Sequence, residues 1–509
     1  MVGLVRRWVV LIAFAGLHGA ALGQATPRAV EGGLRAGWTA SNFEGWPIQE
    51  RMSHHGVAGL QVAVIENGQV AWTRAYGLAD RDRERAAEAG TLFQLGHLSM
   101  PLAAVLAMDL HEAGVLDLDS GANSQFRGWR IRTGIGESAD DVTLRSVLSH
   151  TAGLEGVRFS GASGEMLVPR LIDKLEGRPP ANNPPVRQVR PSGVWTFSSG
   201  GYAALQRAIG DASGVAYERV LRDRVLDPAG MSRTTHWLGP VRTLPAGAAQ
   251  GHVMRDPDAG DLAGVSWFEG DAHVYRASAA MGMWSTAGEY ASFAAGLLRA
   301  MNGAEGELLD PATARGLLEP AAWDVAPIDP LRPSADDWLV GWGEGFSILR
   351  RPGAGDAEVF LVHRAQTPGF CGLVVLSPSS NGGVVVLANQ FEGEALLWEV
   401  AHAVARAGEW HGFERPDLQD VHLWLRDFEE AESVSLVGSF NDFTPGQMVC
   451  EQALDGTWRI TIALPPGTYQ YGFMVDGEFV GDTRNPITER GPDGVVRSRL
   501  VVQPVREVE

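Results

Sequence analysis

Lysine is almost absent from this sequence of 509 residues, because Lys174 is the only one and arginine supplies the other basic side chains. The 42 basic residues are outnumbered by 61 acidic ones, so the formal net charge is −19 at pH 7. A protein that binds nucleic acid needs a dense patch of cations for the phosphates, and this balance argues against such a partner. The scarcity of lysine also limits where any reaction that needs an amine could take place.

Cysteine is equally scarce, since only Cys371 and Cys450 occur. A change in composition near residue 410, described below, places these two residues in different domains. A disulfide between them would have to cross a domain boundary, and we therefore predict two buried free thiols.

Long hydrophobic runs are also missing. The N-terminal apolar run, residues 8–17, has about half the length that a membrane-spanning helix needs. Arg6 and Arg7 precede this run, and the small residues Ala21 and Gly23 follow it, which is the pattern of a secretory signal peptide cleaved after residue 23. We predict export to the periplasm or to the outside of the cell, with no stable membrane span after cleavage. The alternative is a short anchor that is not cleaved.

The remaining residues divide into two domains. Apolar runs at 60–65 and 70–75 flank an Asn-Gly turn, and a second hairpin is predicted over residues 373–387, followed by a helix at 394–406. Helical patterns also occur at 101–113 and 202–212. The predicted fold class is α+β, with helices packed on an antiparallel sheet that strands from both ends of the domain complete. We predict a linker at 24–36, this domain at 37–410 and a second linker at 411–420.

Beyond the second linker the sequence is typical of short strands. The runs 434–437, 458–464 and 469–475 are rich in β-branched and aromatic residues, with turn signals at 465–467 and 476–477. We predict a small immunoglobulin-like β-sandwich over residues 421–509.

Six segments of the larger domain carry recognisable motifs. They are FQLGHLSMP at 93–101, LSHTAGL at 148–154, PSGVWTFSSGGY at 191–202, LDPAGM at 226–231, WSTAGEY at 284–290 and HRAQTPGF at 363–370. In this order they resemble the motifs of serine β-lactamases, penicillin-binding proteins and related esterases. The resemblance covers roughly residues 37–410 and implies that fold, whereas activity depends on the residues of the site.

The first motif has lost its reacting groups. The resemblance implies a serine that the substrate acylates and a lysine three residues later that holds or takes its proton. Here the serine position is His97 and the lysine position is Met100. A thioether has no usable proton affinity, so Met100 cannot replace a lysine. Because Leu171 stands three residues before Lys174, the motif S-x-x-K occurs nowhere in this sequence.

The other two catalytic motifs have also changed. In the second, the tyrosine position is Phe197, which has no hydroxyl, and the asparagine position is Ser199. In the third, His363 is retained, whereas its two neighbours are Arg364 and Ala365. That strand edge supplies oxyanion contacts in the family, so the bulk of alanine and the charge of arginine alter it. No catalytic residue is therefore predicted.

The cleft that the resemblance implies could still bind a ligand. We predict that the residues facing it are His97, Ser198, His363 and Arg364. His97 and His363 could share a metal ion, but two ligands are fewer than protein metal sites use, so we predict neither a metal nor a cofactor. No G-x-S-x-G or H-E-x-x-H motif offers another catalytic apparatus.

The C-terminal segments VSLVGSFNDF at 434–443, DGTW at 455–458 and PPGTYQYGFMVDG at 465–477 resemble the family 48 carbohydrate-binding modules, which include the glycogen-binding domain of AMP-activated protein kinase. The resemblance implies α-glucan binding by stacking of sugars on aromatic rings, here at Phe443 and Phe479. Gly472 replaces a lysine that would donate a hydrogen bond. By strand alternation, Trp424 and Trp458 are predicted to be core residues. The alternative is a sandwich that only packs against the larger domain.

These observations leave three hypotheses about function. The first is an exported, non-catalytic protein whose cleft and sandwich bind a glycan, either an α-glucan or a peptidoglycan fragment. The second is a hydrolase of the esterase, β-lactamase or peptidase type that uses a non-standard apparatus. The third is a structural or interaction protein that binds no small molecule.

Overall fold

The computed structural model describes residues 24–35, 45–133, 141–155, 159, 161–162, 166–237, 244–253, 273–323, 339–350, 358–410, 413, 419–441, 443–453, 455–464, 467–491 and 494–502. The predicted signal peptide, residues 1–23, lies outside these ranges. Within them, no helix combines the length and the apolar character that are needed to cross a membrane.

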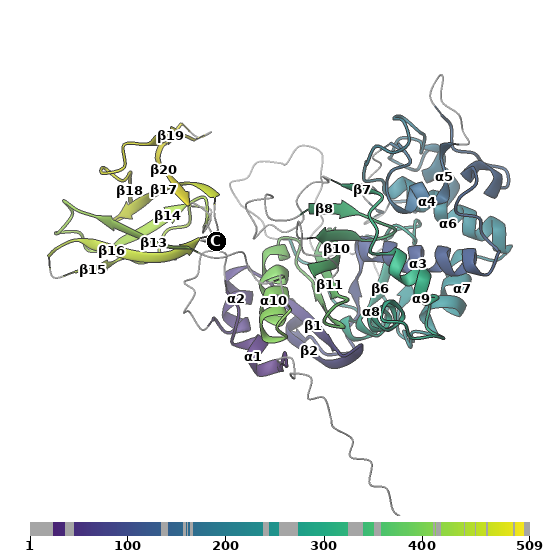
Figure 1. The fold of residues 1–509 in the computed structure, drawn as a ribbon, viewed down its shortest axis with the longest axis horizontal. Helices are drawn as coiled ribbons and strands as arrows, with labels where there is room; N and C mark the ends of the chain where they lie inside the picture. Colours follow the sequence, from purple (N-terminus) through teal and green to yellow (C-terminus); the bar gives the residue numbers. More distant parts are fainter. Residues whose placement is uncertain are drawn as a thin grey trace, which may run out of the picture.

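The larger part of the chain is built around an antiparallel sheet (Figure 1). Leu60 stands opposite Ala388, so strands from the two ends of this part pair with each other, as predicted. The strands run in the order β3 (Arg85–Ala86), β2 (Gln69–Asp80), β1 (Gly59–Glu66), β12 (Gly382–Ala388), β11 (Phe370–Ser377), β10 (Val359–Thr367), β9 (Ser347–Arg350), β8 (Leu339–Trp342) and β7 (Ala322–Trp323).

Both predicted hairpins are present. Asn67 and Gly68 have φ angles of 51° and 69° between β1 and β2, which is the geometry of the tight turn that an Asn-Gly pair favours. The Gly68 N–H donates to the carbonyl oxygen of Asn381 at 2.8 Å, and Asn381 lies in the turn between β11 and β12. The two hairpins therefore support each other at the same end of the sheet.

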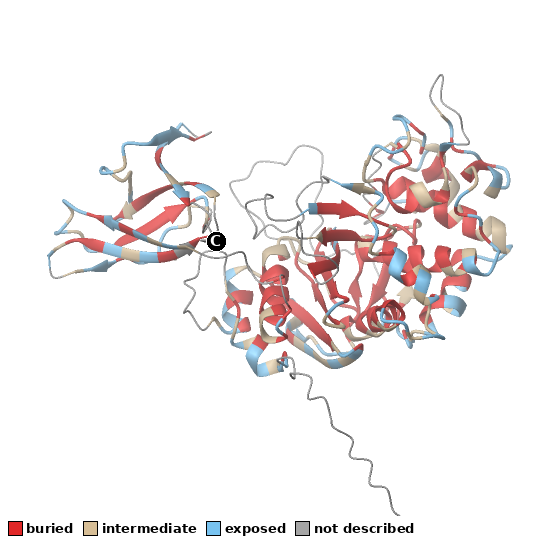
Figure 2. Cartoon of the chain, in the orientation of Figure 1, coloured by how far each residue is buried: buried red, intermediate tan, exposed pale blue. Residues whose placement is uncertain are grey.

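Helices cover both faces of the sheet, and Figure 2 shows its central strands almost entirely buried. Alternate side chains enter different cores: Val374 belongs to the core under α3 and α8, whereas Val375 belongs to the core under α10. The first core includes α3 (Ser99–Glu112) and α8 (Ala287–Met301); the second includes α1 (Pro27–Glu31), α2 (Ile48–His54) and α10 (Glu394–Ala407).

The prediction of a linker at 24–36 is wrong for the described residues 24–35. Val30 and Leu34 are fully buried in the second core, and α1 packs against α10. The indole N–H of Trp72 donates to the carbonyl oxygen of Ala25 at 2.6 Å. Val30 lies on α1, whereas Leu34 follows the helix and forms an antiparallel bridge with Trp46, so both side chains are held against the sheet.

A buried ion cluster joins α2 to α10. The guanidinium of Arg51 donates from Nε to Glu399 Oε2 at 2.7 Å, and His55 Nε2 lies 3.0 Å from Glu399 Oε1. Arg51 also stacks over the ring of Trp46, with its Cζ 4.8 Å from the ring centroid. Burial alone would raise the pKa of Glu399, but the hydrogen bonds from Arg51 and His55 lower that pKa to about 2.

The region between β4 and β7 is mostly helical (Figure 1). Helix α6 confirms the helix predicted at 202–212; Ser198 caps its N-terminus, and Gly214 ends it with φ 69°. The elements are β4 (Phe93–Gln94), η1 (Gly96–Leu98), η2 (Ala122–Gln125), α4 (Leu144–Leu148), α5 (Leu171–Glu176), α6 (Ser199–Ser213), α7 (Tyr217–Leu221), the π-helix η4 (Arg222–Leu226), β5 (Thr235–His236), β6 (Met283–Ser285) and α9 (Pro311–Gly316).

The C-terminal residues form the predicted sandwich of two sheets with a core of their own. Leu436, Tyr471 and Phe473 are buried at its centre. One sheet has the order β13 (Gln419–Leu425), β16 (Trp458–Leu464) and β15 (Glu451–Gln452); the other has the order β14 (Val434–Gly438), β17 (Gly467–Val475), β20 (Val496–Val502) and β19 (Thr488–Arg490), with β18 (Glu478–Val480) paired to β17.

One of the two tryptophan predictions for the sandwich is confirmed and the other is wrong. Trp458 is 8% exposed and donates its indole N–H to the carbonyl oxygen of Phe428. Trp424 is 43% exposed, because Leu423 and Leu425 on either side of it occupy the core-facing positions of β13. Alternation along a strand shows that every second side chain shares a face, but it does not show which of the two faces is buried.

The two cysteines are free and buried, as predicted. Cys371 lies on β11 in the larger domain, and Cys450 precedes β15 in the sandwich. Burial raises the pKa of both thiols, that of Cys450 to about 12, so both stay protonated and unreactive at neutral pH.

Candidate functional site

His97 lies on the short helix η1, directly before α3 and beside β10. Gly96 has φ 52°, and a Cβ atom there would stand 2.7 Å from the Thr367 side chain, so only glycine lets this turn approach the strand so closely. The imidazole of His97 is half-buried, and its Nε2 lies 3.3 Å from Ser199 Oγ. The position where the family carries its nucleophile therefore holds an aromatic ring on a rigid turn.

Met100 occupies the first turn of α3 and is completely buried in the first hydrophobic core. Ser99, on the residue before it, is also buried, and its hydroxyl donates to the carbonyl oxygen of Gly96 at 2.8 Å. The position of the family's lysine is therefore filled by an apolar side chain, and the neighbouring hydroxyl is used within the turn.

Ser198 is predicted to contact a ligand, but its hydroxyl is already used within the fold. Its Oγ donates to the carbonyl oxygen of Glu155 at 2.7 Å and accepts the N–H of Gly201 at 3.2 Å. The side chain is buried and caps α6. We therefore correct its role from ligand contact to helix cap, which is the use that serines most often have at this position.

His363 and Arg364 point to opposite faces of β10. His363 is buried, and its Nδ1–H donates to the carbonyl oxygen of Gly345 at 2.9 Å. Arg364 is exposed on the other face, where it pairs with Glu394 at the start of α10. The prediction that both residues line one cleft is therefore wrong for Arg364, because successive side chains of a strand alternate between its faces.

His150, in the LSHTAGL segment, belongs to the same site and was not singled out from the sequence. It has φ 58°, an unusual value outside glycine and one that a fixed local structure must support. Its Nδ1 accepts the N–H of Ser198 at 3.2 Å, so the proton of the neutral ring is on Nε2. A histidine in a segment already recognised as a motif was the available signal.

Five rings pack together at this site, and we call them the ring cluster: His97, His150, Phe197, Trp342 and His363. Phe197 is central, with centroid distances of 5.1 Å to His97, 4.6 Å to His150 and 5.9 Å to Trp342. Trp342 lies 5.6 Å from His363. The ring that replaces the family's tyrosine is thus packed between histidines and offers no hydroxyl.

The ring cluster carries little charge at neutral pH. Burial lowers the pKa of His363 to about 4. Burial, with the neighbouring His363 and His97, lowers the pKa of His150 far below its usual value. The Nε2 atom of His150 has no hydrogen-bond partner within the described part of the chain. The arrangement can offer the half-buried rings of His97 and Phe197 to a ligand, and it lacks the ammonium that the family mechanism needs.

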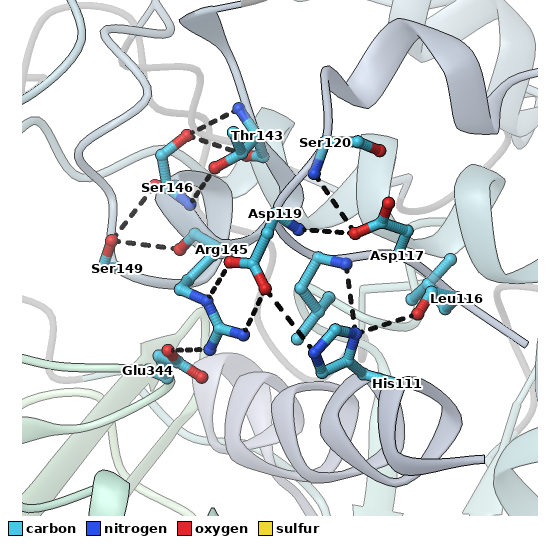
Figure 3. A network of polar contacts seen from close by, with 11 residues as sticks. His111, Leu116, Asp117, Asp119, Ser120, Thr143, Arg145, Ser146, Ser149 and Glu344 are labelled. Atoms are coloured by element: carbon cyan, nitrogen blue, oxygen red, sulfur yellow. Dashed lines mark hydrogen bonds and ion pairs between the residues drawn. The ribbon is translucent and has the colours of Figure 1, made fainter. Parts of the chain in front are cut away.

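A polar network holds one wall of the ring cluster in place (Figure 3). Arg145 donates from Nη2 to Asp119 Oδ2 at 3.0 Å and from Nη1 to Glu344. Glu344 precedes Gly345, whose carbonyl oxygen accepts the hydrogen bond from Nδ1–H of His363. The network therefore connects the end of α3 to the turn between β8 and β9, which positions His363.

The same network contains a group that resembles a metal site. The ligand atoms of His111, Asp117 and Asp119 lie within 4.8 Å of one another. Arg145 already neutralises Asp119, and Asp117 accepts the backbone N–H groups of Asp119 and Ser120. We interpret the three side chains as a turn stabilised by its own hydrogen bonds.

Lys174 does not supply the missing amine by another route. It lies on α5, buried, with Nζ 4.8 Å from the centroid of the Phe159 ring. Burial lowers its pKa to about 8. The position of the family's lysine, in the first turn of α3, belongs to Met100.

In the sandwich, the two rings predicted to bind sugars are both half-buried. The guanidinium carbon of Arg497 lies 4.2 Å from the centroid of Phe443 and covers one of its faces. A Cβ atom on Gly472 would stand 2.3 Å from Cζ of Phe479, so the phenyl ring lies directly over that glycine. Because residue 472 is a glycine and has no side chain, the ring of Phe479 can occupy the space above it.

Comparisons with known proteins agree with this geometry. The sequence model of the family described as Beta-lactamase matches residues 48–408, and the one described as the glycogen recognition site of AMP-activated protein kinase matches residues 424–507. A β-lactamase from Pseudomonas fluorescens is 24% identical over 365 residues, which cover 71% of this chain and 96% of that protein.

Solved structures share the fold. A penicillin-binding protein homologue from Pyrococcus abyssi, described as octameric, superposes with a TM-score of 0.59 and 17% identity over 85% of this chain and 93% of its own. A penicillin-binding protein from Bacillus halodurans superposes with a TM-score of 0.52 and 21% identity over 70% of this chain and 99% of its own. The chain therefore belongs to the β-lactamase family, and its C-terminal domain is of the glycogen-binding type.

Proposed function

We propose that this protein is an exported, non-acylating member of its family, in which the ring cluster and the C-terminal domain bind ligands. The observation that carries the proposal is the buried thioether of Met100 at the position where acylation needs an ammonium. Phe197 supports it, since its packed ring has no hydroxyl for proton relay. Loss of a reacting group in such mechanisms costs several orders of magnitude in rate.

The ligand that the ring cluster suits is a saccharide or a peptidoglycan fragment. The half-buried rings of His97 and Phe197 offer apolar faces, and the imidazole of His97 can exchange hydrogen bonds with hydroxyl and amide groups. Export is proposed on the sequence pattern of residues 1–23. N-terminal sequencing of the mature protein is expected to begin at Gln24.

A second candidate function is hydrolysis by a different nucleophile. Ser199 Oγ lies 3.3 Å from His97 Nε2, which is near the separation of a serine and its general base. Against this candidate, Ser199 is fully buried as the first residue of α6, so a substrate carbonyl could not reach its hydroxyl without movement of the helix.

One experiment separates the two candidates. The mature protein is incubated with a fluorescent penicillin and with an activated ester, and the products are analysed by intact mass. We expect no covalent adduct and no ester turnover above that of the His97→Ala and Ser199→Ala variants, with circular dichroism verifying that all three proteins are folded. A mass increase that peptide mapping places on Ser199 would overturn the proposal.

We further expect the C-terminal domain to bind neutral α-glucan through Phe443 and Phe479. Replacing either with alanine removes a stacking surface and should weaken binding to soluble glycogen about tenfold, measured by affinity electrophoresis. Val449→Ala, at a residue 64% exposed in the same domain, is the control and should leave the affinity unchanged. Equal binding by all four proteins would exclude these two rings as the binding surface, and no binding by the wild type would assign the sandwich a packing role instead.

A further inference from the structure

A groove with a different chemistry lies on the other sheet of the sandwich. It has a volume of about 440 Å³ and runs over the outward-facing side chains of β13 and β16. Phe443 and Phe479 lie instead beside β14 and on β18, which belong to the second sheet. We propose that this groove is a second carbohydrate site, which binds an acidic polysaccharide bearing carboxylate groups.

Trp424 supplies the aromatic surface of the groove. Its side chain is 43% exposed, although tryptophan side chains are highly buried on average. It projects from the middle of a paired strand, since Trp424 stands opposite Arg459 of β16. The strand therefore holds the ring on a rigid base, and a sugar could stack on it at a small entropic cost.

Arginine surrounds this ring. Arg426, Arg459 and Arg484 all line the groove, and its lining contains no acidic residue. The guanidinium of Arg484 lies 5.7 Å from the centroid of Trp424, and Arg459 pairs with Asp455 at 2.6 Å. Within the described residues, neither Arg426 nor Arg484 makes an ion pair with a carboxylate. In a chain with a net charge of −19, such a local excess of cations requires an explanation.

These two features together select the ligand. An arginine fork binds a carboxylate through two parallel hydrogen bonds, and a tryptophan ring binds the apolar face of a sugar. His422, whose Nδ1 lies 2.8 Å from Thr461 Oγ1, adds polar groups that could bind sugar hydroxyls at the same groove. A neutral glucan would leave Arg426 and Arg484 without a carboxylate partner, whereas a uronate-rich chain would supply carboxylates for these arginines and sugar faces for Trp424.

The test uses affinity electrophoresis of the full chain in gels containing polygalacturonate, with glycogen and single-stranded DNA in separate gels. We expect polygalacturonate to retard the wild-type protein, and Trp424→Ala or Arg484→Gln to raise its dissociation constant at least tenfold. Trp424→Phe should keep most of the affinity. Binding should weaken as salt is added, because charged contacts at the surface are screened.

Matched variants make the result specific. Arg219→Gln removes one exposed charge from α7 in the larger domain and should change nothing. Phe443→Ala and Phe479→Ala should bind glycogen more weakly and keep their affinity for polygalacturonate, so the two sites fail independently. The inference is overturned if polygalacturonate does not retard the wild type, if Trp424→Ala binds it as well as the wild type does, or if DNA is bound equally well through the same residues.

Discussion

Replacing Glu399 with glutamine is expected to destabilise the larger domain by about 3–5 kcal/mol at pH 7. The substitution leaves the guanidinium of Arg51, which is only 7% exposed, without its carboxylate in the interface between α2 and α10. A buried charge that loses its partner retains its desolvation cost and loses the attraction that offset it. Differential scanning calorimetry should show the loss in the transition of the larger domain.

The effect should depend on pH in a defined direction. The pKa of Glu399 is about 2 in the folded protein, below the value of 4.5 for an unperturbed glutamate. A depressed carboxylate pKa contributes stability that is fully present above about pH 4.5 and is lost as the pH falls toward 2. The difference between the wild type and Glu399→Gln should therefore shrink over this window as the solution is acidified.

Glu394 on the same helix provides the control. It pairs with Arg364 at the surface, where both side chains are partly solvated, and Glu394→Gln should change stability by less than about 1 kcal/mol. If Glu399→Gln were as stable as Glu394→Gln at pH 7, the triad of Arg51, His55 and Glu399 would have no role in joining α2 to α10.

Replacing Met100 with lysine should be equally damaging. The new ammonium would enter a fully buried position in the first hydrophobic core, beside the apolar side chains of α3. Desolvation of a buried lysine lowers its pKa by several units, which corresponds to at least about 4 kcal/mol at 1.36 kcal/mol per unit. The expected result is a large fall in the unfolding temperature at pH 7.

This loss should diminish in alkaline solution. Because the folded pKa of the introduced lysine would lie below its unfolded value of about 10.4, the penalty is complete below the folded pKa and disappears as the pH rises toward the unfolded one. Met100→Leu conserves volume and should cost less than about 1.5 kcal/mol. A Met100→Lys variant as stable as Met100→Leu at pH 7 would mean that the site still accommodates the family's amine, and the non-acylating proposal would lose its main support.

Much of the fold follows from local sequence. The hairpin turn at Asn67 and the second hairpin predicted over residues 373–387 are present, and the strands and helices predicted around them differ from the observed ones by a few residues. Turn residues and hydrophobic periods act over short distances, so they can be read without knowing the tertiary structure. The order of motifs predicted the β-lactamase fold for the same reason, since each motif is a contiguous segment.

The site was predicted less completely, and the errors share a cause. Arg364 faces away from His363, Ser198 is used as a helix cap, and Trp424 lies outside the core. In each instance the sequence gives the residue, but the prediction of its contacts or burial was wrong. The burial and contacts of a side chain depend on which elements pack against it, and these elements come from parts of the chain that are far apart in the sequence.

By itself, the sequence determined that this chain has the β-lactamase fold without S-x-x-K and with His97, Met100 and Phe197 in the catalytic positions. Only the tertiary structure decided that His97 and Phe197 pack in a ring cluster that includes His150, and that Met100 is buried in the core. It also decided that arginines line a groove beside Trp424. The physical reason is that residue identity is local, whereas burial, protonation and ligand access depend on neighbours that only the folded chain brings together.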